Sequence, residues 1–207
     1  MPKKILLTGG SGFMGMALTD KLLNQGCTVC WLSRKPSNNS KVSFIDSTSE
    51  FECEVLELNP DITIHLAAAY DNSNVVDMIK CNVELPVRLL RAISELDPHN
   101  RCFLYAGSYW QNGDLLTPNI PVDIYSSSKK SLHSFIDYFS EYEKIKCMEL
   151  VFHGTYGGSD KRGKLLDKLL DSIYTGEEIK LSKGQQIINL VHVDDICSAM
   201  TAKVSSH

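Results

Sequence analysis

The sequence lacks the features of a membrane, nucleic-acid-binding or disulfide-stabilised protein. No apolar run reaches the about 20 residues that a membrane-spanning helix needs. The formal net charge is −4, so neither nucleic acid nor an anionic membrane surface is expected to attract the chain as a whole. Its seven cysteines are odd in number and lie mostly in apolar runs, which favours reduced thiols in the cytoplasm. Residues 1–8 are too short and polar for a signal peptide, so we expect a soluble intracellular protein.

Short apolar runs alternate with segments of helical period, which is typical of βαβ units stacked around a parallel sheet. A chain of 207 residues can bury one sizeable core with a small appendage. The pattern predicts two prominent helices, a long amphipathic one over 75–96 and another over 125–143. The predicted strands are 4–8, 28–32, 42–45, 62–66, 103–106 and 148–152. We therefore predict an α/β protein with a Rossmann-type, doubly wound parallel sheet.

Glycines occupy positions 9, 12 and 15, directly between the first predicted strand and its helix. Glycine permits a tight turn and lets backbone N–H groups approach a pyrophosphate, at which the following helix points its positive end. A glycine-rich turn without a ligand is the alternative. The position inside the first βαβ unit favours a dinucleotide.

The end of the second predicted strand bears on the choice of nicotinamide cofactor. An acidic residue there would bind the ribose 2′-hydroxyl of NAD, whereas this chain has Ser33 and Arg34. A guanidinium suits a 2′-phosphate, so NADP(H) is favoured and NAD(H) stays open. The alternative for Arg34 is a solvated surface side chain.

Tyr125 and Lys129 have the spacing that places a phenol and an ammonium on one face of a helix, where the ammonium can lower the phenol pKa. Tyr142 and Lys146 have the same spacing. Only Tyr125 begins its helix just after the fifth predicted strand, at the sheet edge where ligands bind. We therefore predict Tyr125 and Lys129 as catalytic and place Tyr142 at the surface.

Ser108 lies at the end of the fifth predicted strand, where its hydroxyl could hydrogen-bond a substrate carbonyl. Alone it would be an ordinary turn residue. With Tyr125 and Lys129 it completes a catalytic group. No compact ligand set accompanies Asp194 and Asp195, so we predict no metal site and expect this pair to cap the last helix.

Taken together, these residues resemble the extended short-chain dehydrogenase/reductase family of NAD(P)-dependent sugar-nucleotide epimerases, dehydratases and reductases. The resemblance covers nearly the whole chain. The segments that carry it are Thr8–Gly15, Pro60–Asp61, His65–Ala69, Asn82–Val83, the Ser108 loop, the Tyr125/Lys129 pair, Gly154–Gly157 and Val191–Asp195.

The resemblance implies a role for each site residue. Tyr125 would be the proton donor or acceptor, Lys129 would hold the nicotinamide ribose, and Ser108 would orient the carbonyl. Residues 1–157 would form the NADP-binding domain and 158–207 a partial substrate lobe with a return segment to the sheet. The further cofactor contacts would be Gly9, Ser11, Gly12, Phe13, Met14, Gly15, Ser33, Arg34, Asp46, Ala67, Ala68, Ala69, Asn82, Phe152, His153 and Thr155.

Two segments narrow the subgroup. Residues 108–111 and 153–164 look like CDP-abequose and CDP-paratose synthases, which reduce a 4-keto dideoxysugar on a nucleoside diphosphate. Family dehydratases carry an Asp-Glu pair after the catalytic Ser or Thr, where this chain has Tyr109 and Trp110, so dehydration is disfavoured. We expect substrate contacts from Tyr109, Trp110, Asp160, Arg162 and Lys164.

The resemblance therefore implies NADPH-dependent reduction of a keto sugar nucleotide. Two alternatives remain: an NAD-dependent sugar-nucleotide 4-epimerase, and a non-catalytic NADP-binding protein on the same fold. Family members continue beyond the Val-Asp-Asp segment, so the substrate lobe is expected to be incomplete or completed by a partner. A homodimer is possible, and neither nucleic acid nor membrane is expected as a partner.

Overall fold

The computed structural model describes residues 2–97, 101–114, 116–157, 160, 163–184 and 188–206. Its centre is a six-stranded, wholly parallel sheet with the strand order β3-β2-β1-β4-β5-β6. The strands are β1 (Lys4–Thr8), β2 (Thr28–Ser33), β3 (Val42–Asp46), β4 (Ile62–His65), β5 (Cys102–Ser108) and β6 (Lys146–Phe152). This order confirms the predicted Rossmann-type sheet.

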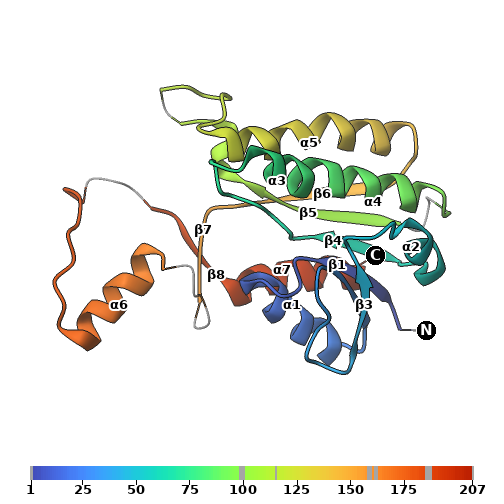
Figure 1. Ribbon diagram of the computed structural model, residues 1–207, viewed down its shortest axis with the longest axis horizontal. Helices are drawn as coiled ribbons and strands as arrows, with labels where there is room; N and C mark the ends of the chain where they lie inside the picture. The colour runs from blue at the N-terminus through green and yellow to red at the C-terminus, as the bar shows by residue number, and fades with distance from the viewer. Residues whose placement is uncertain are drawn as a thin grey trace.

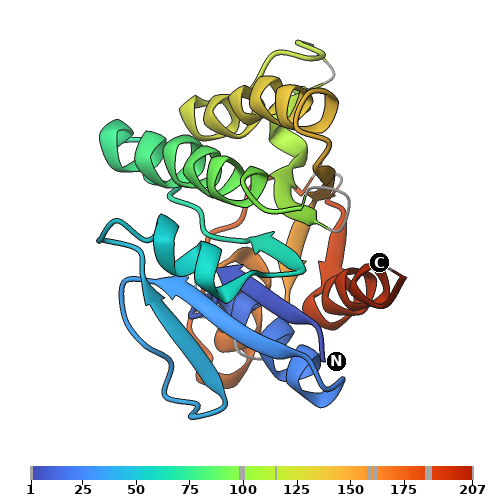
Figure 2. The same ribbon diagram turned by 90° about the vertical axis from the view of Figure 1, so that its right-hand side faces the viewer.

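Helices cover both faces of the sheet (Figure 1, Figure 2). Helices α1 (Phe13–Asn24) and α7 (Val193–Ser206) pack on one face, and α2 (Glu52–Leu58), α4 (Leu85–Ser94) and α5 (Ile124–Glu141) on the other. Because successive side chains of a strand point to opposite faces, Ile5 and Leu7 join the first core and Leu6 the second. All three are fully buried, which explains why the strands are continuous apolar runs in the sequence.

The long helix expected over 75–96 is interrupted. It consists of α3 (Val75–Ile79), a wide π-helical turn η1 (Lys80–Glu84) and α4, which ends at Ser94. Pro86 provides the physical reason, since it has no N–H for the carbonyl of Asn82 and its ring would collide with that carbonyl in a regular α-helix. The wider turn places Asn82 in the protein interior, where its side chain is fully buried.

The chain leaves the sheet after β6 and returns to it. Strand β7 (Gly154–Tyr156) pairs in parallel with β8 (Leu190–His192), and α6 (Leu165–Thr175) between them projects away from the sheet (Figure 1). Helix α7 then packs against α1, burying Val193 and Met200 in the first core. The described part of residues 158–206 therefore contributes both an outlying helix and part of the main core.

The cap expected from Asp194 and Asp195 was wrong. Helix α7 begins at Val193, and Nδ1 of His192 accepts the N–H of Asp194 at 3.2 Å, so His192 caps the helix. The two aspartates lie in the first turn, where their negative charge interacts favourably with the helix dipole and stabilises the helix.

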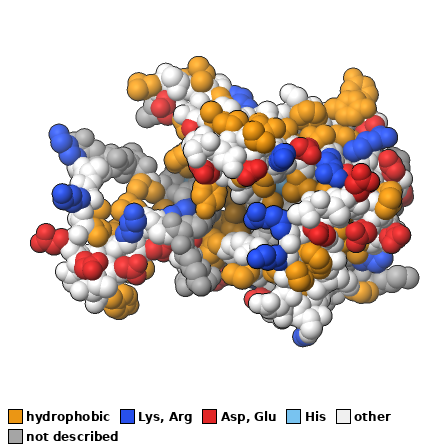
Figure 3. Space-filling model, viewed as in Figure 1, with side chains coloured by type: hydrophobic (Ala, Val, Ile, Leu, Met, Phe, Trp, Pro, Cys, Tyr) orange, Lys and Arg blue, Asp and Glu red, His pale blue; other side chains and the backbone are white. Residues whose placement is uncertain are grey.

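Charge distribution, helix hydropathy and the cysteines complete the description of the fold. Charged side chains of both signs are scattered over the face shown in Figure 3. No helix among the described residues is long and apolar enough to span a membrane. All seven cysteines are free thiols.

Candidate active site

The carboxyl ends of the parallel strands meet at one edge of the sheet and bring the predicted site residues together. Thr8 at the end of β1 pairs in register with His65 at the end of β4. The hydroxyl of Thr8 lies 2.8 Å from His65 Nδ1 and accepts the N–H of Ala67 at 3.1 Å. These bonds fix the loop after β4 beside the glycine turn.

The glycine turn lets the start of α1 pack closely against the end of β1 and leaves its outer side open. A Cβ at Gly15 would lie 2.1 Å from the carbonyl oxygen of Gly9, so this glycine is required by packing. A Cβ at Gly12 would meet nothing nearer than 3.2 Å, and Gly12 is exposed. No side chain caps α1 and no acidic residue lies in its first turn, so its positive end is open to an anion. The turn therefore fits a dinucleotide pyrophosphate.

A fourth glycine, Gly10, was not predicted to matter. Its lack of a side chain lets Trp31 pack directly against this turn. A Cβ at Gly10 would lie 2.3 Å from the ring of Trp31, which is buried on β2 beneath the turn. Trp31 Nε1 donates to the hydroxyl of Thr19 at 3.0 Å, and that hydroxyl donates to the carbonyl of Gly15 at 2.7 Å. The buried indole and α1 together support the turn from below.

Ser33, Arg34 and Asp46 are the residues expected to contact the adenosine ribose of the cofactor, and their surroundings differ from one another. The Ser33 hydroxyl donates to the Lys35 carbonyl at 2.6 Å, and Asp46 accepts hydrogen bonds from Thr48 at 2.8 Å, so both side chains are engaged locally. Arg34 is exposed at the end of β2. Arg34 and the next residue, Lys35, are the exposed cations at this end of β2.

Asn82 links the loop after β4 to helix α5. Its amide nitrogen donates to the Ala69 carbonyl at 2.8 Å and to the Ser128 hydroxyl at 2.9 Å, while its oxygen accepts the Ala69 N–H at 2.9 Å. The Ser128 hydroxyl in turn donates to the carbonyl of Tyr125 at 2.7 Å. Asn82 thus positions the expected cofactor loop against helix α5.

Helix α5 begins one residue before Tyr125 and is firmly capped. Asp123 accepts the N–H of Ser126 at 2.7 Å, and Asn72 accepts the N–H of Tyr125 at 3.1 Å. Asn72 also donates to Asp123 at 3.2 Å. Asn72 and Ser128 escaped the sequence interpretation because their partners are remote in the chain or belong to the backbone.

Ser108 lies beside Tyr125, and Lys129 lies one turn further along α5, but the electrostatics of these residues differ from expectation. The Ser108 side chain lies close enough to the Tyr125 phenol to act on its pKa. Burial raises the pKa of Tyr125, as does Asp123, while Ser108 lowers it. The expected net lowering of the Tyr125 pKa was wrong for this structure, because desolvation of the phenol dominates.

Lys129 is almost completely buried, with 2% of its surface exposed. Burial lowers its pKa to about 8, opposed by Cys81 and Glu149. Burial raises the pKa of the Cys81 thiol on η1, opposed by Lys129 and Arg34. The charges of Lys129 and Arg34 are therefore both felt at η1, next to Asn82.

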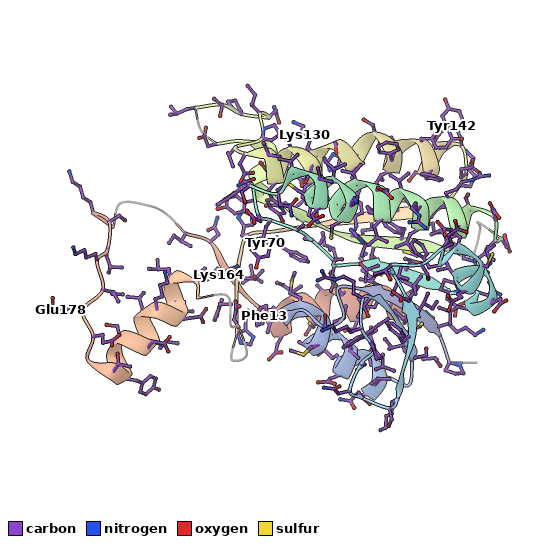
Figure 4. The ribbon with its side chains drawn as sticks, in the orientation of Figure 1. Phe13, Tyr70, Lys130, Tyr142, Lys164 and Glu178 are labelled. Carbon is purple, nitrogen blue, oxygen red and sulfur yellow. The ribbon has the colours of Figure 1, made fainter. Side chains whose placement is uncertain are left out.

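Tyr142 lies at the surface, as predicted. It follows the last residue of α5 and is 73% exposed. Figure 4 shows it at the upper right of the molecule, far from Phe13 and Lys164 near the middle of the view. The two tyrosine–lysine pairs have the same spacing, but they lie at different places in the fold.

Ser108 starts a short 3-10 helix, η3 (Tyr109–Asn112), and forms a reciprocal cap with Gln111. Its hydroxyl accepts the N–H of Trp110 at 3.4 Å, and its N–H donates to Gln111 Oε1 at 3.0 Å. The Ser-x-x-Gln spacing is a capping-box signature that could have identified Gln111 from the sequence.

Residues 5–206 match the model of the NAD dependent epimerase/dehydratase family. The chain belongs to this family.

The curated relatives of this family member include CDP-abequose synthases. That of Yersinia pseudotuberculosis is 34% identical over 98% of this chain and 74% of its own length. That of Salmonella muenchen is 24% identical over 95% of this chain and 68% of its own length.

Solved structures support the fold. UDP-glucuronic acid 4-epimerase from Bacillus cereus, in complex with UDP-glucuronic acid and NAD, superposes with a TM-score of 0.82 at 19% identity, covering 97% of this chain and 73% of that chain. UDP-glucose 4-epimerase from Thermotoga maritima, with UDP-glucose, gives a TM-score of 0.83 at 22% identity, covering 95% and 71%.

In this member of the family, aromatic side chains follow Ser108. Tyr109 stacks on His153 with ring centroids 4.9 Å apart, and Trp110 meets Tyr109 edge-on at 5.8 Å. Tyr109 and Trp110 are 39% and 42% exposed. Phe152 ends β6 just before His153. The rings of Tyr109, Trp110 and His153 form a partly exposed aromatic surface beside the serine, whereas Phe152 packs against the core.

The remaining expected substrate residues lie near β7. Lys164 Nζ donates to the carbonyl and hydroxyl oxygens of Thr155 at 3.4 and 3.3 Å, and the N–H of Asp160 donates to the Gly157 carbonyl at 3.2 Å. Arg162 lies outside the described residues. A largely apolar hollow of about 300 Å³ lies between α6 and β7, with Lys164, Leu165 and Leu190 in its lining.

Proposed function

We propose that this epimerase/dehydratase family member reduces the keto group of a nucleoside diphosphate sugar with NADPH. The observation that carries the proposal is the proximity of the Ser108 side chain to the Tyr125 phenol, with the buried Lys129 one turn along the same helix as Tyr125. The group lies at the strand edge onto which the glycine turn opens. The 34% identity to a CDP-abequose synthase supports a 4-keto deoxysugar on CDP or a similar nucleoside diphosphate as the substrate.

The residues fit an NADPH molecule along this edge. The glycine turn and the uncapped start of α1 would hold the pyrophosphate, and Arg34 the 2′-phosphate. Lys129 would hold the nicotinamide ribose. We assign cofactor binding to residues 1–157 and substrate binding mainly to 158–207, with Tyr109 and Trp110 as aromatic contacts. NADPH, when bound, supplies the hydride that the carbonyl carbon receives.

The side chains of the chain itself would handle the proton. Ser108 would hydrogen-bond the carbonyl oxygen, and Tyr125 would transfer its phenolic proton to that oxygen as negative charge develops there. The raised pKa of Tyr125 keeps the phenol protonated near neutral pH, which suits a proton donor. The ammonium of Lys129 would offset the phenolate that remains until solvent returns the proton.

The test compares Tyr125→Phe with the control Tyr142→Phe on 4-keto sugars linked to CDP, dTDP, GDP and UDP. The Tyr125 variant should lose about 10²- to 10⁴-fold in kcat with NADPH affinity unchanged, because only proton transfer is removed. The control should behave as wild type. Loss of NADPH absorbance measures the reaction, and titration measures the affinity.

Three results would contradict the proposal in different ways. Tightly retained NAD⁺ with indifference to added NADPH would identify a 4-epimerase. NADPH binding without turnover on any keto sugar nucleotide would identify a non-catalytic binding protein. Full activity of Tyr125→Phe would show that the proton comes from elsewhere.

A further inference from the structure

A polar network lies behind Ser108 and is not part of the reacting group. Gln111 is fully buried. Its Nε2 lies 2.6 Å from Oε1 of Glu149 on β6 and 3.1 Å from Nε2 of His133 on α5. The other carboxylate oxygen of Glu149 lies 3.1 Å from His133 Nε2. The network therefore connects β6 and α5 to the residue that caps Ser108.

Gly107 provides the space for this network. A Cβ at Gly107 would lie 2.1 Å from Glu149 Oε1 and 2.7 Å from its Cδ. The carboxylate of Glu149 therefore lies directly over the backbone of β5, one residue before Ser108. A side chain at position 107 would displace the carboxylate.

The hydrogen-bond chemistry allows only one orientation of the Gln111 amide. An ionised carboxylate can only accept hydrogen bonds, so the NH₂ group of Gln111 must face Glu149. The amide oxygen must then face the N–H of Ser108, which it accepts at 3.0 Å. The reverse orientation would set oxygen against oxygen and N–H against N–H. Glu149 thus dictates which atom of Gln111 meets the serine.

We propose that Gln111 is a positioning residue for Ser108, held in its working orientation by Glu149. The inference rests on the reduction proposed above. Gln111 is buried and does not touch the substrate, but it fixes the backbone of Ser108 and therefore the direction in which the serine hydroxyl points. A displacement of about 1 Å at a reacting group can cost on the order of 10²-fold in rate.

The experiment exchanges the two polar groups. Gln111→Met removes the bonds to Ser108 and Glu149, and Gln111→Glu sets two carboxylates against each other. Each should lower kcat by about tenfold or more while KM and NADPH affinity stay unchanged.

The double variant Gln111→Glu/Glu149→Gln should recover most of kcat, because it restores both hydrogen bonds with the roles of the two side chains exchanged. The new carboxylate at position 111 accepts the serine N–H, and the new amide at position 149 donates to that carboxylate. Gln25→Glu, at the exposed end of α1, is the control for an added carboxylate.

Hydrogen exchange of the Ser108 amide provides a readout that does not depend on turnover. Exchange should accelerate in Gln111→Met and Gln111→Glu and slow again in the double variant. If the wild type turns over no keto sugar nucleotide, the proposed function fails while the exchange comparison still tests the role of Gln111.

Unchanged kcat and unchanged Ser108 exchange in Gln111→Met would overturn the inference. If Gln111→Met does not fold, the comparison of Gln111→Glu with the double variant decides. Recovery on exchanging the groups supports the positioning role, and absence of recovery overturns it.

Discussion

Lys129 is a buried cation whose cost to folding can be measured. Burial lowers its pKa from 10.5 to about 8, and at 1.36 kcal/mol for each pKa unit this difference corresponds to about 3 kcal/mol. Methionine has a similar length and no charge to desolvate. We therefore expect Lys129→Met to raise the free energy of unfolding at pH 7 by about 1 to 3 kcal/mol, the lower value allowing for imperfect packing.

The sign of the pH dependence follows from proton binding. The unfolded chain keeps the lysine proton up to pH 10.5, whereas the folded chain releases it above about pH 8. Between these values the unfolded state binds more protons, so this lysine makes wild-type stability rise with pH. The full penalty is present below about pH 8, and the advantage of the methionine variant should shrink as pH approaches 10.5.

Urea unfolding followed by far-ultraviolet circular dichroism at pH 7 and pH 10 measures both effects. Lys130→Met is the matched control, because Lys130 is the neighbouring, partly exposed lysine and donates to the Asn119 carbonyl. A Lys129→Met variant that is less stable than wild type at pH 7 would refute the reasoning. So would a stability difference of the same size at both pH values.

Three further changes test other parts of the structure. Arg34→Ala should lower NADPH affinity by about ten- to a hundredfold and leave NADH affinity unchanged, since a charge-assisted hydrogen bond contributes about 1.5–3 kcal/mol; equal losses in the two titrations would contradict this. Gly10→Ala should lower the thermal midpoint through overlap with Trp31, whereas Gly12→Ala should keep the fold and weaken dinucleotide binding; the opposite ranking would disprove the assignment. Burial, together with the charge of Lys129, holds the pKa of His65 well below its ordinary 6.5. At a pH lower than about 6.5 the unfolded chain therefore binds one more proton than the folded chain. The free energy of unfolding should then decrease by up to about 1.4 kcal/mol for each further pH unit of acidification. His65→Asn should remove this component in acid titrations of unfolding.

The sheet could be predicted because buried parallel strands are nearly continuous apolar runs. Each of the six predicted strands lies within two residues of its observed bounds. Interruptions were harder to see. The helical period continues through 75–96, so only Pro86 indicated the wide turn that buries Asn82. The cap of α7 depends on His192, a residue with little intrinsic preference for that position.

The candidate site could be predicted in part because carboxyl ends of parallel strands meet at one edge. That rule separates Tyr125 from Tyr142 without coordinates. The rule does not predict contacts between residues that are remote in sequence, such as Gln111 with Glu149 or Gly10 with Trp31. Nor does spacing reveal how strongly burial acts on Tyr125, because desolvation depends on the whole surrounding structure.

The chain has two tryptophans, and the fold places one at each half of the proposed site. Trp31 is 6% exposed beneath the glycine turn, and Trp110 is 42% exposed beside Ser108. Their emission spectra should therefore separate, with a blue-shifted component from the buried indole and a red-shifted one from the exposed indole. A Trp110→Phe variant would isolate the signal of the dinucleotide end, and its difference from the unaltered protein would give the signal of the substrate end.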